Sequence, residues 1–371
     1  MVHFGRRVRE ISSKATYGPI GFDLGRSSVR AVQVQSGPVR PTLKAAIYKK
    51  YPCARQELFA DPGLFREFVR SAMDGQGFNG RKIVTCTPAE HLRLLTLEYP
   101  VSDQVPEAQV ILELVQNQVK EDISELVIDY IPSRAPGESG KRTALVAIAN
   151  LQKQIEFLEM LRGAGLSVAG VEIGPIAIRR LVEKVSRIEE TPNILVVNCG
   201  TESTYLTVTS GRRLMLDRGV KFGERNVVEK IAAALQMTPK EAERLLYGYG
   251  VDSSRQNEEL LGGMINSRDI VGTILGIVTP AFHELTREIE KIVAYARAQL
   301  HGADIQQIYL LGSLSRWPGA ERFLASLMHL PVKVLNPFES FECGVGLQST
   351  LDSLPVSGMA VATGCALSEL R

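Results

Sequence analysis

The chain has 371 residues, of which 44% are hydrophobic and 23% charged, and these ordinary globular values exclude a disordered or fibrous protein. Lysine and arginine number 43 and the acidic residues 41, so the formal net charge of +2 gives no broad attraction to nucleic acid or anionic lipid. The five cysteines include no C-x-x-C pair, which argues against a disulfide framework or a zinc site and favours a reducing compartment. No apolar stretch approaches the roughly 18 residues of a membrane-spanning helix. The basic N-terminus has no apolar signal core behind it, so we expect a cytoplasmic protein.

The opening segment alternates apolar with small or polar residues, as strands do, and the turn Gly25-Arg26-Ser27-Ser28 separates its first two runs. The expected elements are a hairpin over 19–35, a strand over 43–51, a helix from Asp61-Pro62 and a short strand over 83–86. From about residue 91 the pattern changes to strand, helix, two strands, helix and strand, which ends near 173. We interpret this stretch as a compact α+β unit inserted into the chain.

The second half starts after Thr191-Pro192 and repeats the opening arrangement without obvious sequence identity. A buried strand at 194–197, the turn at 198–203 and two further strands follow one another. Helices are expected at 224–235, at 239–246 behind a Thr238/Glu241 capping box, at 268–300 with Pro280 as a start or kink, and at 356–370.

Three turns that each follow a buried strand are the candidate sites of chemistry: Gly25 to Ser28, Gly200 to Ser203, and Gly312-Ser313. Glycine lets the backbone approach a ligand, and successive N–H groups in such turns bind anions. Asp23, at the end of the first strand, is placed to hold Mg²⁺ through water. One such turn is usually an ordinary hairpin, but three in two repeated halves predict a nucleotide clamped between two lobes.

The segment Gly21 to Arg30 resembles the first phosphate loop of the actin-like ATPase superfamily. The inserted unit resembles the small extra domain of the division protein FtsA and of the type IV pilus assembly protein PilM, and the detail favours the PilM family. The segments similar to that family are Glu113–Tyr130, Leu158–Ile173, Met237–Leu245 and Tyr309–Gly319. The likeness runs from about Pro19 to Leu370, nearly the whole chain.

This resemblance implies an α/β protein with a two-lobed actin-like (ribonuclease H-like) fold and a small inserted α+β domain. The first lobe is expected from 18–90 with 174–190, the inserted domain from 91–173 and the second lobe from 191–371. The final helix, at about 356–370, is expected to pack back on the first lobe.

The turns and the resemblance together imply ATP and Mg²⁺ as cofactors, with Asp23 as the possible metal residue through water and with no catalytic residue assigned. The residues expected to bind the nucleotide are Asp23, Gly25, Arg26, Ser27, Ser28, Arg30, Asn198, Gly200, Thr201, Ser203, Gly223, Glu243, Gly312 and Ser313.

The chain departs from the family's pattern at five positions of this pocket. Arg30 replaces a lysine, Asn198 an aspartate, Phe222 and Ser313 each one glycine of a pair, and Leu246 the lysine of an Ala-Glu-x-x-Lys motif. Asn198 removes a negative charge from the expected Mg²⁺ shell, and Phe222 is expected to put a ring where backbone and ligand come close. Because phosphoryl transfer depends on positioning and charge neutralisation, we expect weak or no hydrolysis of ATP. The pocket then either still binds a nucleotide or no longer does.

The resemblance implies a cytoplasmic adaptor or scaffold of a type IV pilus or related secretion machine, peripheral at the inner face of the inner membrane. The expected partners are the tail of a PilN-like inner-membrane protein, held in a groove beside the inserted domain, other pilus assembly proteins, and further copies of the chain. Nucleic acid is not expected. The alternatives are an FtsA-like filament or membrane-tethering protein, a nucleotide-hydrolysing actin-like ATPase, and a small-molecule kinase of the same superfamily. The end of the chain soon after a core helix counts against the FtsA-like alternative, and Asn198 counts against the kinase.

Overall fold

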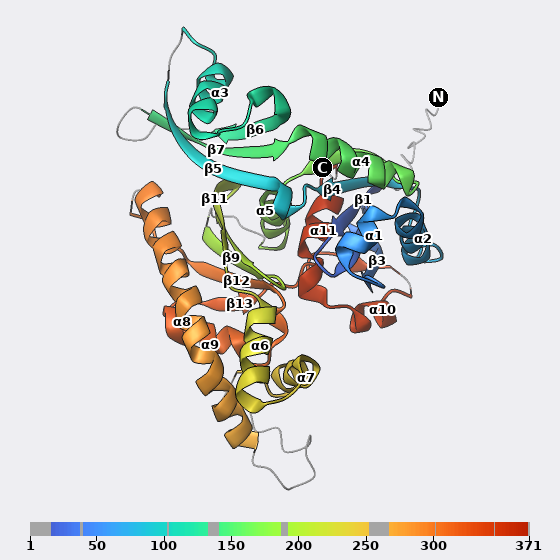
Figure 1. Ribbon diagram of the computed structural model, residues 1–371, viewed down its shortest axis with the longest axis vertical. Coiled ribbons are helices and arrows are strands. Elements are labelled where there is room, and N and C mark those ends of the chain that lie inside the picture. Colours follow the sequence, from blue (N-terminus) through green and yellow to red (C-terminus); the bar gives the residue numbers. More distant parts are fainter. Residues whose placement is uncertain are drawn as a thin grey trace, which may run out of the picture.

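The structure is a computed structural model that describes residues 16–37, 40–101, 104–132, 141–186, 192–251, 267–300, 302–344 and 346–369. The basic N-terminus, the expected lobe boundary at Thr191 and residues 252–266 lie outside these residues. Three sheets organise the chain into a first lobe, an inserted unit and a second lobe, and the second lobe extends away from the other two (Figure 1).

The first lobe is built on a six-stranded sheet with the order β14-β3-β2-β1-β4-β8. The first three strands form an antiparallel meander, and β4 and β8 continue the sheet in parallel. The strands are β1 (Tyr17–Leu24), β2 (Ser28–Gln35), β3 (Thr42–Lys50), β4 (Lys82–Cys86), β8 (Ser167–Glu172) and β14 (Glu342–Cys343). The helices of this lobe are α1 (Arg55–Ala60), α2 (Pro62–Met73), α4 (Leu151–Gly163), α5 (Gly174–Val185), α10 (Gln348–Ser353) and α11 (Ala360–Ala366).

The second lobe repeats this topology in the order β11-β10-β9-β12-β13, so the predicted duplication of the opening arrangement is confirmed at the level of the sheet. Its antiparallel meander comes first in the chain and its parallel strands follow, as in the first lobe. The strands are β9 (Asn193–Cys199), β10 (Thr204–Ser210), β11 (Arg213–Val220), β12 (Gln307–Gly312) and β13 (Val332–Val334). The helices are α6 (Glu224–Leu235), α7 (Pro239–Tyr249), α8 (Ser267–Gln299) and α9 (Ala320–Met328).

The inserted unit has its own three-stranded antiparallel sheet, β5-β7-β6, covered on one face by a single helix. Its elements are β5 (Leu92–Pro100), α3 (Glu107–Gln118), β6 (Leu126–Pro132) and β7 (Lys141–Asn150). The helix and strand that the sequence assigns to the end of this unit, α4 and β8, belong to the first lobe instead. The strand β8 pairs with β4, and Phe157 and Leu161 of α4 are buried in the first-lobe core beside Phe65.

The long helix α8 is continuous through Pro280, which neither starts it nor ends it. Proline in a helix interior removes one hydrogen bond and costs about 3 kcal/mol. Buried side chains on both sides of the proline, among them Val278, Phe282 and Leu285, pack into the second-lobe core and offset this cost.

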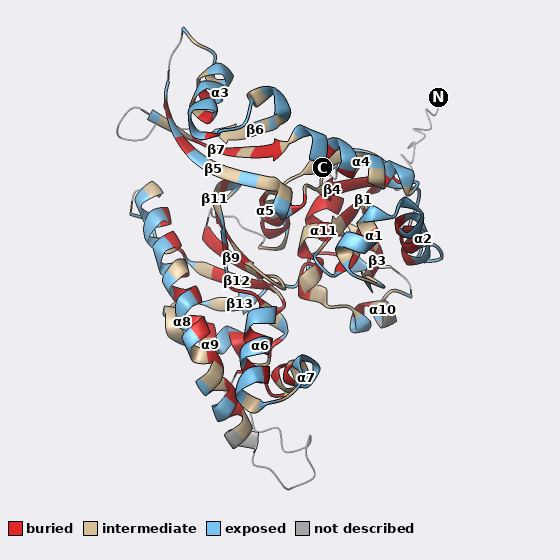
Figure 2. Ribbon diagram, in the orientation of Figure 1, coloured by how far each residue is buried: buried red, intermediate tan, exposed pale blue. Residues whose placement is uncertain are grey.

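One hydrophobic core joins the two lobes, because it contains Val32 of the first sheet, Val196 and Leu311 of the second, and Met359 near the C-terminus. Figure 2 shows the buried residues concentrated on the strands and on α11, with the outer faces of α2 and α8 exposed. The single helix expected over 356–370 is a short 3₁₀ turn, Val356–Met359, followed by α11. This helix lies against β1 and α5 so closely that a Cβ on Gly21 would meet the carbonyl oxygen of Ala362 at 1.8 Å.

Candidate functional site

The first turn, between β1 and β2, is a tight hairpin fastened to the end of β3. The amide of Gly25 donates to the carbonyl of Ser28 at 3.0 Å, and the amide of Tyr51 donates to the carbonyl of Ser27 at 3.0 Å. The Tyr51 hydroxyl donates to the carbonyl of Gly25 at 2.9 Å. The turn backbone is therefore held from one side, while the side chains of Arg26 and Ser27 remain exposed.

Asp23, the residue expected to serve a metal ion, is already paired with a cation. Arg30 Nη1 lies 2.9 Å from Asp23 Oδ2, and both side chains are mostly buried. The Arg30 guanidinium also lies 5.8 Å from the ring centroid of Tyr48, and a Cβ on Gly25 would come within 2.4 Å of Arg30 Nη1. A metal ion on Asp23 would have to displace a guanidinium group that its surroundings hold in place.

The second turn, between β9 and β10, is bound to the first residues of α6. The amide of Gly200 donates to the carbonyl of Ser203 at 2.9 Å. The amides of Glu224 and Arg225 donate to the carbonyls of Gly200 and Thr201 at 3.1 and 2.9 Å. These α6 amides, which in other proteins bind phosphate, are thus satisfied by the chain's own backbone.

Gly223 explains how the second turn comes so close to α6. A Cβ at this position would lie 2.6 Å from the carbonyl oxygen of Thr201 and 2.5 Å from the carbonyl carbon of Glu202. Only glycine permits this approach. The ring of Phe222, which the sequence analysis places in the crevice, is instead buried in the second-lobe core, with its centroid 5.6 Å from that of Phe282. The expectation that this ring obstructs a ligand is therefore wrong.

The third turn packs directly on the end of β9. Gly312 has φ +74°, and a Cβ there would lie 2.0 Å from the carbonyl oxygen of Cys199 and 3.0 Å from Asn198 Oδ1. The amide of Ser313 donates to the Cys199 carbonyl at 2.8 Å, and its hydroxyl donates to the same oxygen at 3.2 Å. Parallel pairing of β12 with β9 brings these two strand ends to one edge of the sheet.

An ion pair between the lobes completes the arrangement. Arg26 of the first turn lies 2.6 Å from Glu202 Oε2 of the second turn, and Arg225 of α6 lies 2.7 Å from the other oxygen, Oε1. The structure thus connects the first turn to the second, and the second to the third. The prediction that the three turns face a single crevice requires this proximity.

A second cluster links α6, α7 and the segment that follows the third turn. The Tyr247 hydroxyl of α7 bonds to both Glu224 and Arg316, and the Arg316 guanidinium lies 4.7 Å from the centre of the Tyr247 ring. Burial and the Glu224 carboxylate raise the pKa of Tyr247, so its hydroxyl stays protonated. Glu243, the residue expected here, lies half-buried on α7, and Tyr247, four residues later, makes the contact to α6.

These residues fit an anion better than they fit a metal–nucleotide complex. Two arginines and the turn backbone suit a phosphate group, but Glu202 already pairs with both arginines. Asp23 is paired with Arg30, and the described residues contain no group of three or more His, Cys, Asp or Glu side chains arranged to hold a metal ion. In this arrangement Asp23 is therefore engaged by Arg30 and is not open to Mg²⁺.

The contacts of the site depend on five residues that the sequence analysis does not assign to it: Glu202, Arg225, Glu224, Tyr247 and Arg316. Glu202 lies inside a predicted turn and Arg225 two residues after a predicted glycine. The sequence feature that could have identified Glu202 and Arg225 is a charged residue inside or next to a predicted turn. It is a weak one, because most charged residues near turns are simply solvated.

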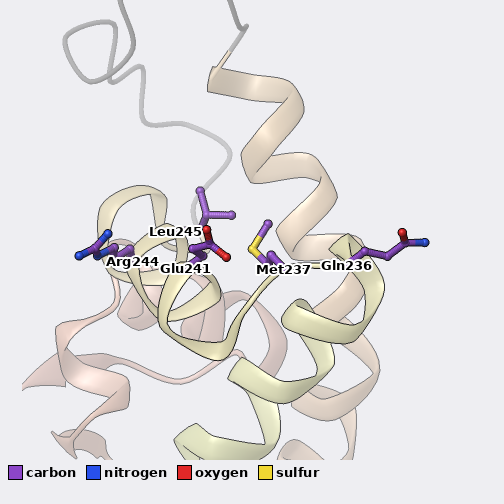
Figure 3. A pocket seen from close by; sticks show the side chains of 5 residues that line it. All are labelled: Gln236, Met237, Glu241, Arg244 and Leu245. Atoms are coloured by element: carbon purple, nitrogen blue, oxygen red, sulfur yellow. The ribbon is translucent and has the colours of Figure 1, made fainter.

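A separate hollow of about 450 Å³ lies at the junction of α6 and α7. Figure 3 shows Met237, Glu241 and Leu245 over its centre, with Gln236 and Arg244 on opposite sides. Glu241 and Leu245 are one helical turn apart, on the face of α7 roughly opposite that of Glu243 and Tyr247. This hollow is therefore not part of the crevice between the turns.

No helix in the described ranges is long and apolar enough to cross a membrane. The chain matches no protein-family model and no curated protein.

Solved structures do resemble it. A chain of the PilM–PilN type IV pilus biogenesis complex is similar with a TM-score of 0.74 and 22% identity, over 94% of this chain and 98% of that chain. The ethanolamine utilization protein EutJ from Carboxydothermus hydrogenoformans has a TM-score of 0.49 and 16% identity, over 95% and 89% of the two chains. An MreB protein of Spiroplasma citri bound to AMPPNP has 0.47 and 13%, over 90% and 96%. At these identities the likeness concerns the fold: the chain has the two-lobed actin-like fold with a small inserted domain, as the PilM–PilN chain does.

Proposed function

We propose that the protein is a cytoplasmic adaptor of a type IV pilus or related secretion assembly machine, placed at the inner face of the inner membrane. The observation that carries this proposal is the likeness in fold to a chain of the PilM–PilN complex, which extends over 94% of this chain and therefore includes the inserted unit. An actin-like fold by itself would fit many functions. The inserted unit and the near-complete coverage of both chains favour the function of the PilM–PilN chain over the other functions of this fold.

The partner is the cytoplasmic tail of a PilN-like inner-membrane protein, and α4 offers apolar anchors for it beside the inserted unit. Leu151 and Ile155 are each 39% exposed and lie one turn apart, directly after β7. Leu64 on the neighbouring helix α2 is 36% exposed. Apolar side chains at such spacing are the anchors that a short peptide uses when it docks on a helix.

Binding of this tail can be tested by titrating the protein with a labelled synthetic peptide of the tail and following fluorescence anisotropy. The double variant L151S/I155S should weaken binding about tenfold, since covering the exposed 39% of each side chain contributes roughly 1.5 kcal/mol for the pair. Leu112→Ser is the matched control, because Leu112 is similarly exposed on α3 of the inserted unit. Equal affinity of the wild type and the α4 variant would refute this docking site, and no binding by the wild type would refute the adaptor role.

In this proposal the crevice binds ATP weakly and turns it over slowly or not at all, and its occupant adjusts the lobes and so the affinity for the tail. Two features support weak binding and slow turnover. Asp23, the expected metal residue, is paired with Arg30, and Asn198 stands where the resembled family has an aspartate of the Mg²⁺ shell. Calorimetric titration with ATP and Mg²⁺ should show weak binding that Asn198→Asp strengthens. Equal affinity for the tail with and without ATP and Mg²⁺ would refute the coupling.

A further inference from the structure

The carboxylate of Glu202 is shared by two arginines that come from different lobes. Its Oε2 pairs with Arg26 of the first lobe at 2.6 Å, and its Oε1 pairs with Arg225 of the second lobe at 2.7 Å. Each oxygen therefore has its own guanidinium group. A carboxylate held between two guanidinium groups is in the environment that arginine pairs otherwise provide for a phosphate.

The backbone around Glu202 is held by hydrogen bonds, whereas the side chain of Arg26 is half-exposed. The turn of Glu202 is bonded to the α6 amides of Glu224 and Arg225, and Gly223 packs against the backbone of Glu202. The Arg26 side chain is 48% exposed and extends from the hairpin of the other lobe. Loss of the ion pair would thus free the Arg26 side chain and leave the backbone of both turns in place.

The first turn also contains a polar group without a partner in the described ranges. The hydroxyl of Ser28 is completely buried and has no hydrogen-bond partner among the described residues. Buried hydroxyl groups in folded proteins almost always have one, and each exception calls for an explanation. The first turn therefore holds one polar group that the described part of the chain does not satisfy.

We propose that Glu202 is a built-in occupant of the crevice's anion position, which bridges the two turns in the absence of a ligand and which a phosphate chain must displace. This inference rests on the proposed function, because it explains why the crevice binds nucleotide weakly. The ligand class is a short polyphosphate, free or as part of a nucleotide. Displacement would leave Arg26 and Arg225 to bind the phosphate oxygens, and the lobes would then be joined through the ligand.

The contrary interpretation is an ordinary surface ion pair without consequence for ligands. The two interpretations predict different changes in anion affinity when Glu202 is removed. If Glu202 competes with phosphate, its removal strengthens anion binding, while removal of Arg26 weakens it, although both changes break the same ion pair. An ion pair that only stabilises the fold would give the two variants the same effect.

The test compares wild type, Glu202→Gln, Arg26→Gln and the control Glu121→Gln by calorimetric titration with pyrophosphate and, separately, with ATP. Glu121 is also a half-exposed carboxylate paired with an arginine, Arg93, but lies in the inserted unit. Exposed ion pairs contribute about 0.2–1 kcal/mol each, so the loss of both should raise the affinity of Glu202→Gln about twofold to thirtyfold. Arg26→Gln should bind more weakly than wild type, and Glu121→Gln should not differ from it. Similar gains for pyrophosphate and ATP would assign the effect to the phosphate chain, and a gain for ATP alone would overturn that assignment.

Unchanged or weaker anion binding by Glu202→Gln overturns the proposal, as does a complete lack of binding by both wild type and Glu202→Gln. Titration with the tail peptide is independent of these outcomes. Failure of the tail to bind would refute the adaptor role and leave the anion result standing.

Discussion

Asp217 should make the protein less stable as the pH rises toward neutrality. It is half-buried on β11, directly opposite Thr207 of β10, whose hydroxyl donates to Asp217 Oδ1 at 2.5 Å. Burial raises the pKa of Asp217 from 3.8 to about 7, and the Thr207 hydrogen bond lowers it only in part. The sheet therefore favours the protonated carboxyl group.

The sign of the effect follows from proton binding in the two states. Below about pH 4 both the folded and the unfolded chain hold this proton, so the group adds no pH dependence. As the pH rises from about 4 to about 7, the unfolded chain loses the proton while the folded chain keeps it, and the free energy of unfolding falls. Above the folded pKa of about 7 both states are ionised and the full cost is present.

A shift from 3.8 to about 7 corresponds to about 4 kcal/mol. Because the residue keeps partial contact with water, we expect about half of this, roughly 2 kcal/mol. Part of the cost is already present at about pH 5, so about 1 to 1.5 kcal/mol should build up between about pH 5 and pH 8.

Asp217→Asn removes the ionisation and keeps the shape of the side chain. Urea unfolding of the variant and the wild type should show a difference in unfolding free energy that grows, in favour of the variant, by about 1 to 1.5 kcal/mol from about pH 5 to pH 8. Asp129→Asn, at an exposed position on strand β6, is the control and should show no such growth. A difference that stays constant or moves in the other direction would refute the reasoning.

Two glycine substitutions test the packing of helices and one threonine substitution tests the capping of a helix, all by urea unfolding. Gly21→Ala should destabilise the protein by about 1–3 kcal/mol or more, because the new Cβ would overlap the Ala362 carbonyl and push α11 off β1. Gly272→Ala, on α8 with open space around it, should instead stabilise by about 0.5–1 kcal/mol, and equal effects at the two glycines would contradict this account. Thr238→Ala removes the capping box that Thr238 forms with Glu241 and should cost about 1 kcal/mol, whereas a neutral result would mean that the cap contributes nothing.

Short-range patterns in the sequence were enough to predict most elements and the three turns. The hairpin at Gly25 and the Thr238/Glu241 capping box depend on residues a few positions apart, so alternation, glycine and cap residues determine them. Two runs of three successive strands, one near the start of each half of the chain, likewise indicated the duplicated lobes. The helix over 268–300 was also predicted, but its pattern left open whether the helix starts at Pro280. Packing partners far away in the chain outweigh the local cost of the proline, so the helix runs through it.

Contacts between distant segments decided the rest. The strand β8 follows the inserted unit in sequence but pairs with β4, about 80 residues earlier, and no local pattern distinguishes these two placements. The ring of Phe222 turned into the core because Phe282 on α8 offers it an apolar neighbour. In the sequence, Glu202 has the pattern of a solvated turn residue. Only the packing of the two lobes brings Arg26 to its carboxylate. Secondary structure follows from the chemistry of neighbouring residues, whereas charge pairing across the crevice depends on how two lobes pack, and that packing is the sum of many weak contacts that a linear pattern does not contain.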